Sequence, residues 1–220
     1  MIVAGRPPRL VVIADLGALG PPVIDRALAL MAALGPLAAD VRLHERDATG
    51  TPDRVRLARL VALREASARA GVALVVGGRP DLALAVGADG VQLPERGLPP
   101  ALVRRAFPRL SIGRSCHDAA GLAAAARGGA DWALLAPLHD PHSKPATSPA
   151  LGLQGFRAAL DAAATALGGA LALPVYALGG VEASDLAPVI AAGGAGVATI
   201  GAVLGRPDPG AAVAAFMGPS

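Results

Sequence analysis

Short apolar runs rich in valine, isoleucine and leucine recur along this chain and alternate with longer amphipathic segments, and this repeat restricts the fold more than any other feature. The runs predict eight strands, at residues 10–15, 40–46, 73–78, 90–95, 111–117, 132–138, 174–180 and 196–202. Helical segments are predicted between them, at 52–70, 99–107, 118–128, 152–168 and 184–192, with starts marked by Pro52, Asp118 and Ser184. Alternating strands and helices are typical of a parallel sheet covered by helices.

The number of repeats and the chain length together predict one closed barrel. A chain of 220 residues fits one domain, spanning 1–220, and eight βα units in it indicate an α/β protein with a single (β/α)8 TIM barrel. The C-terminal tail would supply the eighth helix. A doubly wound sheet is the competing fold, but it would carry a glycine-rich fingerprint after its first strand, and "DLGALG" at 15–20 matches that poorly.

Composition and charge exclude several classes of function. The chain has no run of about 18 uncharged apolar residues, which argues against a membrane span. A lone cysteine, Cys116, cannot form an internal disulfide or a cysteine-built metal site; it fits a reducing cytoplasm, and we expect a small buried hydrophobe. Net charge is only +3, the arginines are dispersed and aromatic residues are few, so nucleic acid is not an expected partner.

Polar side chains gather where the predicted strands end, and all four histidines are among them. In a barrel of this type the reaction site is built at the carboxyl ends of the strands. Two interpretations stay open. The residues could form one shared site, or they could be the ordinary polar residues that occur wherever a strand ends in a turn. The residues concerned are His44 and Arg46 after the second strand, Glu95 after the fourth, Arg114, Ser115 and His117 on the fifth, and His139, His142 and Lys144 after the sixth.

The stretch "LLAPLHDPHSKP" at 134–145 holds two of the histidines and the chain's only lysine. It begins the longest segment without predicted structure, 139–151, and long loops in compact domains are usually functional or disordered. The sequence predicts that His139, His142 and Lys144 fold over the barrel mouth and that one of the histidines transfers protons. A stiff, solvated surface loop, given its many prolines, is the alternative.

Glycines end the last two predicted strands, in "ALGG" at 177–180 and "TIGA" at 199–202. Backbone N–H groups at such positions can approach an anion closely, and barrels often bind phosphate there. The sequence therefore predicts a phosphate site at Gly179, Gly180, Ile200 and Gly201. Ordinary tight turns are the alternative.

Several motifs, taken in order, resemble one family: the thiamine phosphate synthases and their TenI-like relatives. They are "ADGVQLPE" at 88–95, "FPRLSIGRSCHD" at 107–118, "GADWALLAPL" at 129–138, "SKPATSPALGLQGF" at 143–156, "LPVYALGGV" at 173–181 and "GVATIGAV" at 196–203. The resemblance implies a barrel in thiamine biosynthesis that binds a thiazole phosphate at the glycines of the last two strands. It also adds Gln92, in "VQLP", to the substrate-binding residues.

Departures from the synthase pattern concern the metal. Where the synthases have a Gln-x-Arg-x-Lys pattern on the second strand, this chain has Arg42, His44 and Arg46. The two positions that resemble the synthases' metal-binding aspartates are Gly78 and Gly97, and glycine offers no oxygen ligand from a side chain. The sequence thus predicts no metal and no cofactor, activity indifferent to magnesium, and little or no joining of a pyrimidine pyrophosphate to a thiazole phosphate.

The resemblance leaves three functions open. The favoured one is a TenI-like tautomerase that moves a proton on a thiazole phosphate, with His139 or His142 as the acid or base and with Arg46, Arg114 and Lys144 holding carboxylate or phosphate. In the tautomerases the histidine ends strand six, where this chain has Pro137. The alternatives are a thiamine phosphate synthase with an altered site and a regulatory barrel that binds without catalysis. The oligomeric state, a homo-oligomer included, stays open.

Overall fold

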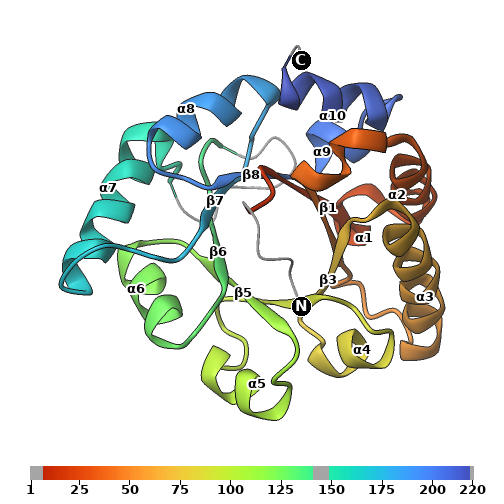
Figure 1. The fold of residues 1–220 in the computed structure, drawn as a ribbon, viewed down its shortest axis with the longest axis horizontal. Coiled ribbons are helices and arrows are strands. Elements are labelled where there is room, and N and C mark those ends of the chain that lie inside the picture. Colours follow the sequence, from red (N-terminus) through yellow and green to blue (C-terminus); the bar gives the residue numbers. More distant parts are fainter. Residues whose placement is uncertain (1–6, 141–148, 219–220) are drawn as a thin grey trace.

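The chain forms a closed barrel of parallel strands surrounded by helices, as Figure 1 shows in a view down the barrel axis. The computed structural model describes residues 7–140 and 149–218. Each strand pairs in parallel with the next along the sequence, and β1 pairs with β8 to close the ring. The predicted (β/α)8 TIM barrel is confirmed.

The strands are short, and most end one to three residues before the predicted boundary. Their bounds are β1 (Leu10–Asp15), β2 (Val41–Arg46), β3 (Ala73–Gly77), β4 (Gly90–Leu93), β5 (Ser111–Cys116), β6 (Trp132–Leu135), β7 (Val175–Leu178) and β8 (Gly196–Thr199). Glu95 and His117 therefore lie in loops just after their strands. The apolar patterns locate the strands, but the last paired residue depends on the neighbouring strand, so the ends are predicted least well.

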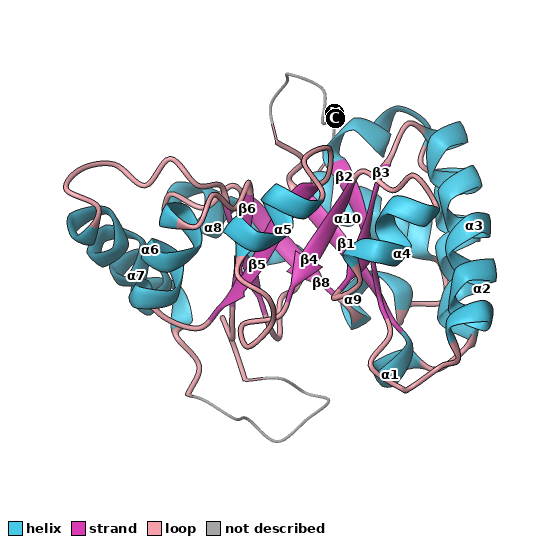
Figure 2. Cartoon of the chain, turned by 90° about the horizontal axis from the view of Figure 1, so that it is seen from below, coloured by secondary structure: helices cyan, strands magenta, loops and turns pink. Residues whose placement is uncertain are grey.

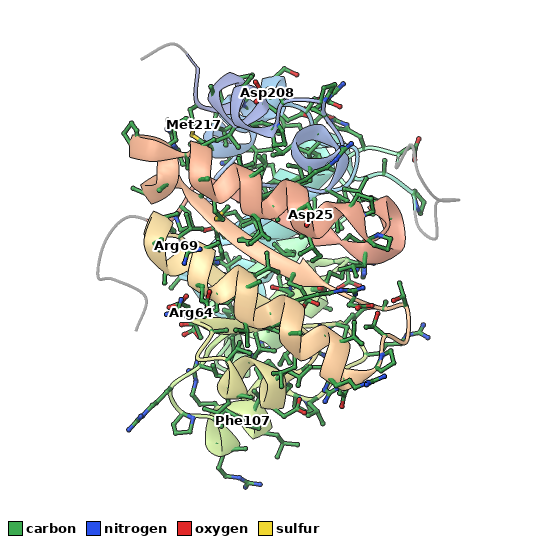
Figure 3. All side chains as sticks on the ribbon, turned by 90° about the vertical axis from the view of Figure 1, so that its right-hand side faces the viewer. Asp25, Arg64, Arg69, Phe107, Asp208 and Met217 are labelled. Carbon is green, nitrogen blue, oxygen red and sulfur yellow. The ribbon has the colours of Figure 1, made fainter. Side chains whose placement is uncertain are left out.

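Helices cover the outside of the ring. They are α1 (Leu16–Leu19), α2 (Pro22–Ala33), α3 (Asp53–Ala70), α4 (Pro80–Ala85), α5 (Pro100–Ala106), α6 (Ala119–Arg127), α7 (Gly152–Ala166), α8 (Leu186–Ala191), α9 (Gly201–Leu204) and α10 (Pro209–Met217), with 3-10 turns at Gly35–Asp40 and Ala183–Asp185. Figure 2 shows the strands crossing the middle of the molecule with helices outside them, and Figure 3 shows α2, carrying Asp25, beside α3, carrying Arg64 and Arg69.

The helix starts follow capping chemistry with one correction. Asp118 caps α6 as predicted, because its carboxylate accepts from the N–H of Gly121. Ser184 does not cap the helix predicted at 184–192. A 3-10 turn at Ala183–Asp185 precedes α8 instead, and Glu182 is its N-cap residue. Glu182 and Asp185 form a capping box there, in which each side chain accepts from the other's backbone N–H.

The strand period of two divides the side chains into two sets. Val12 on β1 and Leu43 on β2 belong to the large core between strands and helices, whereas Val11, Ile13 and Tyr176 belong to a separate cluster inside the ring. Cys116 is buried in the outer core, where burial raises the pKa of its thiol to about 12, so the predicted small buried hydrophobe is confirmed. None of the helices in the described ranges is both long and apolar enough to cross a membrane.

Candidate active site

A cavity of about 550 Å³ opens at the carboxyl ends of the strands. This size is ordinary for a small-molecule site. It is lined by Ile13, Asp15, Ala18, His44, Arg46, Asp47, Ala48, Gly77, Gly78, Gln92, Pro94, Glu95, Ser115, Cys116, His117, Leu134, Ala136, Pro137, Leu178, Gly179 and Ile200. Strands from all around the ring contribute, as the position of reaction sites in this fold leads one to expect.

Many of the residues predicted from strand ends, and one predicted from the family resemblance, meet in this cavity. They are His44, Arg46, Gln92, Glu95, Ser115, His117, Gly179 and Ile200. Residues far apart in the sequence are thus brought into one cavity, which is the arrangement that a shared site requires. Their roles in binding stay predictions.

The second strand directs its basic residues inward. Val41 and Leu43 pack in the outer core, so the period of two turns Arg42, His44 and Arg46 into the barrel. Arg42 lies deepest, with its guanidinium 4.2 Å from the centroid of the Trp132 ring. The barrel interior therefore carries positive charge that increases the attraction of the cavity for anions.

His44 is a neutral histidine in this setting. Burial, and then the nearby charges of Arg46, Arg42 and Arg56, lower its pKa to about 3. Only 4% of the residue is exposed, and neither ring nitrogen has a hydrogen-bond partner within the described part of the chain. A neutral imidazole has one donor and one acceptor nitrogen, so His44 can supply either to a ligand.

The lowered pKa of His44 predicts an acid-sensitive fold. Unfolded imidazole takes up a proton near pH 6.5, whereas the folded ring does so only near pH 3, so the free energy of unfolding falls as the pH drops through this window. We expect His44→Gln to reduce this pH dependence, measured by urea unfolding at a series of pH values. His117→Gln, at a half-exposed ring, is the matched control. An unchanged pH dependence in His44→Gln would contradict a buried neutral imidazole.

Arg46 and Asp15 lie side by side at the mouth, as partners in the pairing of β2 with β1. Asp15 is buried, and its Oδ1 accepts from the N–H groups of Gly17 and Ala18 at 2.9 and 3.2 Å. Its Oδ2 lies 3.4 Å from Nε of Arg46, whose side chain is 39% exposed. Arg46 also lines the cavity, where its guanidinium donors can bind an anionic group.

The glycine ends of β7 and β8 present unused backbone donors. Within the described ranges, no turn or loop hydrogen bond uses the N–H of Gly179, Gly180, Ile200 or Gly201. Gly179 has φ +103° and Gly180 φ +61°, and a Cβ on Gly180 would lie 2.8 Å from Cβ of His139. Glycine is required there by both conformation and packing. The arrangement supports the predicted phosphate site without testing it.

The arginine on β5 does not line this cavity. Arg114 is one position from Ser115, so the pleat places its side chain outside the ring. Its guanidinium donates to the carbonyls of Glu95 and of Leu98, the latter at 2.8 Å. The structure thus gives Arg114 a role in ordering the loop after β4, where the sequence predicts a ligand contact.

The loop after β6 is described only as far as residue 140, and the predicted residues His142 and Lys144 lie outside the described residues. His139 is described. Its Nε2 lies 2.9 Å from Oδ1 of Asp185, and its backbone N–H donates to the carbonyl of Gly179 at 3.0 Å. The pairing with Asp185 ties His139 to the segment after β7, beside the cavity wall rather than among the lining residues.

The described carboxylates do not fit a magnesium ion. Gly78 and Gly97 offer no side-chain ligand, and no group of three or more histidine, cysteine, aspartate or glutamate residues in the described ranges is placed to hold a metal. The carboxylates that line the cavity face basic groups instead. Asp15 faces Arg46 at 3.4 Å and Asp47 faces Arg59 at 3.6 Å, while Glu95 lies 4.0 Å from Nε2 of His117.

Sequence reasoning missed two residues of the site region. Asp15 ends the first predicted strand, so the rule that selected the other strand-end residues also applies to it. Trp132 begins β6 and is buried inside the ring, where its Nε1 donates to Oε1 of Gln92 at 2.9 Å. Nothing in the sequence signals this bond, which joins residues 40 positions apart.

Comparison with known proteins identifies the family. A sequence model described as thiamine monophosphate synthase matches residues 24–203. The chain is 41% identical to the thiamine-phosphate synthase of Methanoculleus marisnigri, over 73% of each protein. It is 46% identical to the thiamine biosynthesis bifunctional protein ThiM/ThiE of Symbiobacterium thermophilum, over 70% of this chain but 31% of that longer protein.

A solved structure agrees with these matches. The thiamine phosphate pyrophosphorylase from Pyrococcus furiosus superposes with a TM-score of 0.78 at 26% identity, covering 95% of this chain and 93% of that one. The family match spans β2 to β8 and the cavity residues that they contribute, and it begins after β1. The chain belongs to the thiamine monophosphate synthase family.

Proposed function

We propose that this chain joins a thiazole phosphate to a pyrimidine pyrophosphate, the reaction of a thiamine phosphate synthase. The observation that carries the proposal is that one cavity has two separate walls suited to anions. One wall is formed by the glycine ends of β7 and β8, and the other by Arg46 and His44 at the end of β2. A reaction between two phosphorylated substrates needs two such walls close together.

The chemistry assigns a task to each wall. The N–H groups of Gly179 and Ile200, which have no backbone acceptor within the described ranges, would hold the phosphate of the thiazole. As the new carbon–nitrogen bond forms, the carbon–oxygen bond to pyrophosphate breaks, and the leaving group takes the electron pair. Arg46, held in place beside Asp15, would stabilise the charge that develops on that leaving group.

The sequence motifs favour proton transfer, but the names of the relatives support the joining reaction. The position of His139 supports it too, because the predicted acid or base pairs with Asp185 outside the cavity lining. Proton transfer remains a second candidate on two observations. The described carboxylates do not fit magnesium, and His117 and Glu95, whose side chains belong to the classes that act as acids and bases, lie 4.0 Å apart in the cavity.

Product analysis tests the proposal. We expect the purified chain, given both substrates, to release thiamine phosphate and pyrophosphate in equal amounts, because the bond that forms and the bond that breaks are coupled. Chromatography would measure both products. A chain that makes neither product, but exchanges a solvent deuteron into the thiazole phosphate tautomer, would replace this proposal with the tautomerase. Tight binding of thiazole phosphate with neither reaction would indicate a binding protein.

The same assay is repeated with EDTA. Because the described carboxylates are paired with basic groups, we expect the rate to change little when the metal is removed. A complete and reversible loss of product with EDTA would show that magnesium binds in a way that the described residues do not indicate.

A further inference from the structure

Three side chains form a chain of hydrogen bonds from the barrel interior to the cavity. Trp132 on β6 is 2% exposed, and its Nε1 donates to Oε1 of Gln92 on β4 at 2.9 Å. Nε2 of Gln92 in turn donates to Oγ of Ser115 on β5 at 3.1 Å. Gln92 and Ser115 line the cavity, whereas Trp132 lies behind them. We call these three residues the relay.

The direction of every bond in the relay follows from the tryptophan. An indole nitrogen can only donate, so the amide oxygen of Gln92 must face Trp132 and its NH₂ group must face Ser115. Ser115 therefore receives a hydrogen bond at its oxygen. Its own hydroxyl proton is left to be donated elsewhere, and the cavity is where the side chain lies.

The tryptophan ring fits inside the barrel because two neighbouring positions are glycine. A Cβ on Gly113 would lie 2.1 Å from Oε1 of Gln92 and 2.3 Å from Nε1 of Trp132. A Cβ on Gly90 would lie 3.0 Å from the far edge of the ring. The guanidinium of Arg42 covers the indole at 4.2 Å. The indole is thus held in one position, and so is the bond that it donates.

We propose that Trp132 is a positioning residue which, through Gln92, sets Ser115 as a hydrogen-bond donor toward an acceptor atom of the ligand, such as an anionic oxygen. The ligand part of this statement rests on the proposed function, because a phosphate ester supplies such oxygens. The relay itself does not depend on the proposed function, because it is defined by contacts within the chain.

The first experiment observes the relay without any ligand. The chain has a single tryptophan, so a ¹⁵N-labelled sample gives one indole N–H resonance that needs no assignment. In Gln92→Met, which keeps the length of the side chain but removes both polar ends, this resonance should move upfield by a large fraction of a ppm and exchange faster with solvent. An unchanged resonance in a folded Gln92→Met protein would overturn the relay.

The second experiment measures coupling through the relay. Affinity for thiazole phosphate is determined by calorimetry for Trp132→Phe, Ser115→Ala and the double variant. Each single change should weaken binding roughly fivefold, the worth of one ordinary hydrogen bond. The double variant should be no weaker than Ser115→Ala, because the tryptophan acts only through the serine. Losses that multiply in the double variant would overturn the positioning role.

Tyr176→Phe is the matched control. Tyr176 is also buried inside the ring, its hydroxyl has no hydrogen-bond partner in the described part of the chain, and it lies outside the relay. The affinity of Tyr176→Phe for thiazole phosphate should equal that of the wild type. A fivefold loss in this variant would show that any change inside the ring weakens binding, and it would contradict the proposal. If the wild type does not bind thiazole phosphate, the proposed function fails, and the indole resonance alone decides the relay.

Discussion

Arg56→Leu should lower the free energy of unfolding by about 3–5 kcal/mol at pH 7, because it leaves a buried carboxylate without its partner. Arg56 on α3 is 6% exposed and Glu45 on β2 is 1% exposed. The guanidinium binds both carboxylate oxygens, at 2.9 and 2.8 Å, and its Nη2 also donates to the carbonyl of Gly77 at 2.7 Å. One side chain thereby joins β2, β3 and α3 directly behind the inward-facing His44 and Arg46.

The loss should depend on pH with a definite sign. Burial raises the pKa of Glu45, and the hydrogen bonds and charge of Arg56 oppose that rise. Without Arg56 the pKa rises further, so the folded state holds a proton that the unfolded state has already released. Stability of the variant therefore decreases as the pH rises through this range, and its deficit relative to wild type should be smaller near pH 5 than at pH 7.

Two further variants make the test specific. Arg69→Leu removes another arginine of α3, which is exposed and lies 4.0 Å from the likewise exposed carboxylate of Glu65, and we expect a loss below about 1 kcal/mol. Glu45→Leu combined with Arg56→Leu should recover much of the stability, since no unpaired charge is then buried. Chemical denaturation measures all of these. Equal losses for Arg56→Leu and Arg69→Leu would contradict the buried ion pair.

Arg46→Gln should reduce kcat/KM for thiamine phosphate formation by about 100-fold or more, the usual effect of removing one preorganised stabilising group. Among the described residues that line the cavity, Arg46 alone is an arginine or lysine. Its guanidinium is oriented by the buried carboxylate of Asp15, which the N–H groups of Gly17 and Ala18 hold in turn. It is therefore placed before any substrate arrives.

Arg64→Gln provides the control for Arg46→Gln. Arg64 on α3 is similarly exposed and forms an ion pair with Asp89 at 3.0 Å, at the opposite end of the barrel (Figure 3). We expect its steady-state kinetics to match those of the wild type. Arg46→Lys should retain part of the activity, because the charge is kept while the forked donor geometry is lost. Wild-type activity in Arg46→Gln would show that the anion of the second substrate binds elsewhere.

Much of this site follows from sequence, for a local reason. Strands and helices alternate with periods that are visible within ten residues, and polar residues after each strand of a parallel barrel must meet at one end. This is why His44, Glu95 and His117 could be assigned to one site although they are far apart in the chain, whereas Gln92 was added only through the family resemblance. The same alternation within β5 separates Ser115 from Arg114, so the position of Arg114 could also have been predicted.

Tertiary structure alone decided which polar atoms pair across the ring. Asp185 pairs with His139 from 46 positions away, and Gln92 accepts from Trp132 across 40 positions. Such pairs depend on the stagger of neighbouring strands and on how closely glycines such as Gly113 allow rings to approach. The sequence determined the barrel, the order of its strands and the end at which the chemistry gathers, because those depend on local periods. Closure of the ring determined the hydrogen-bond partners and the protonation of His44, because burial and the charges of Arg42, Arg46 and Arg56 act on it only once the chain is folded.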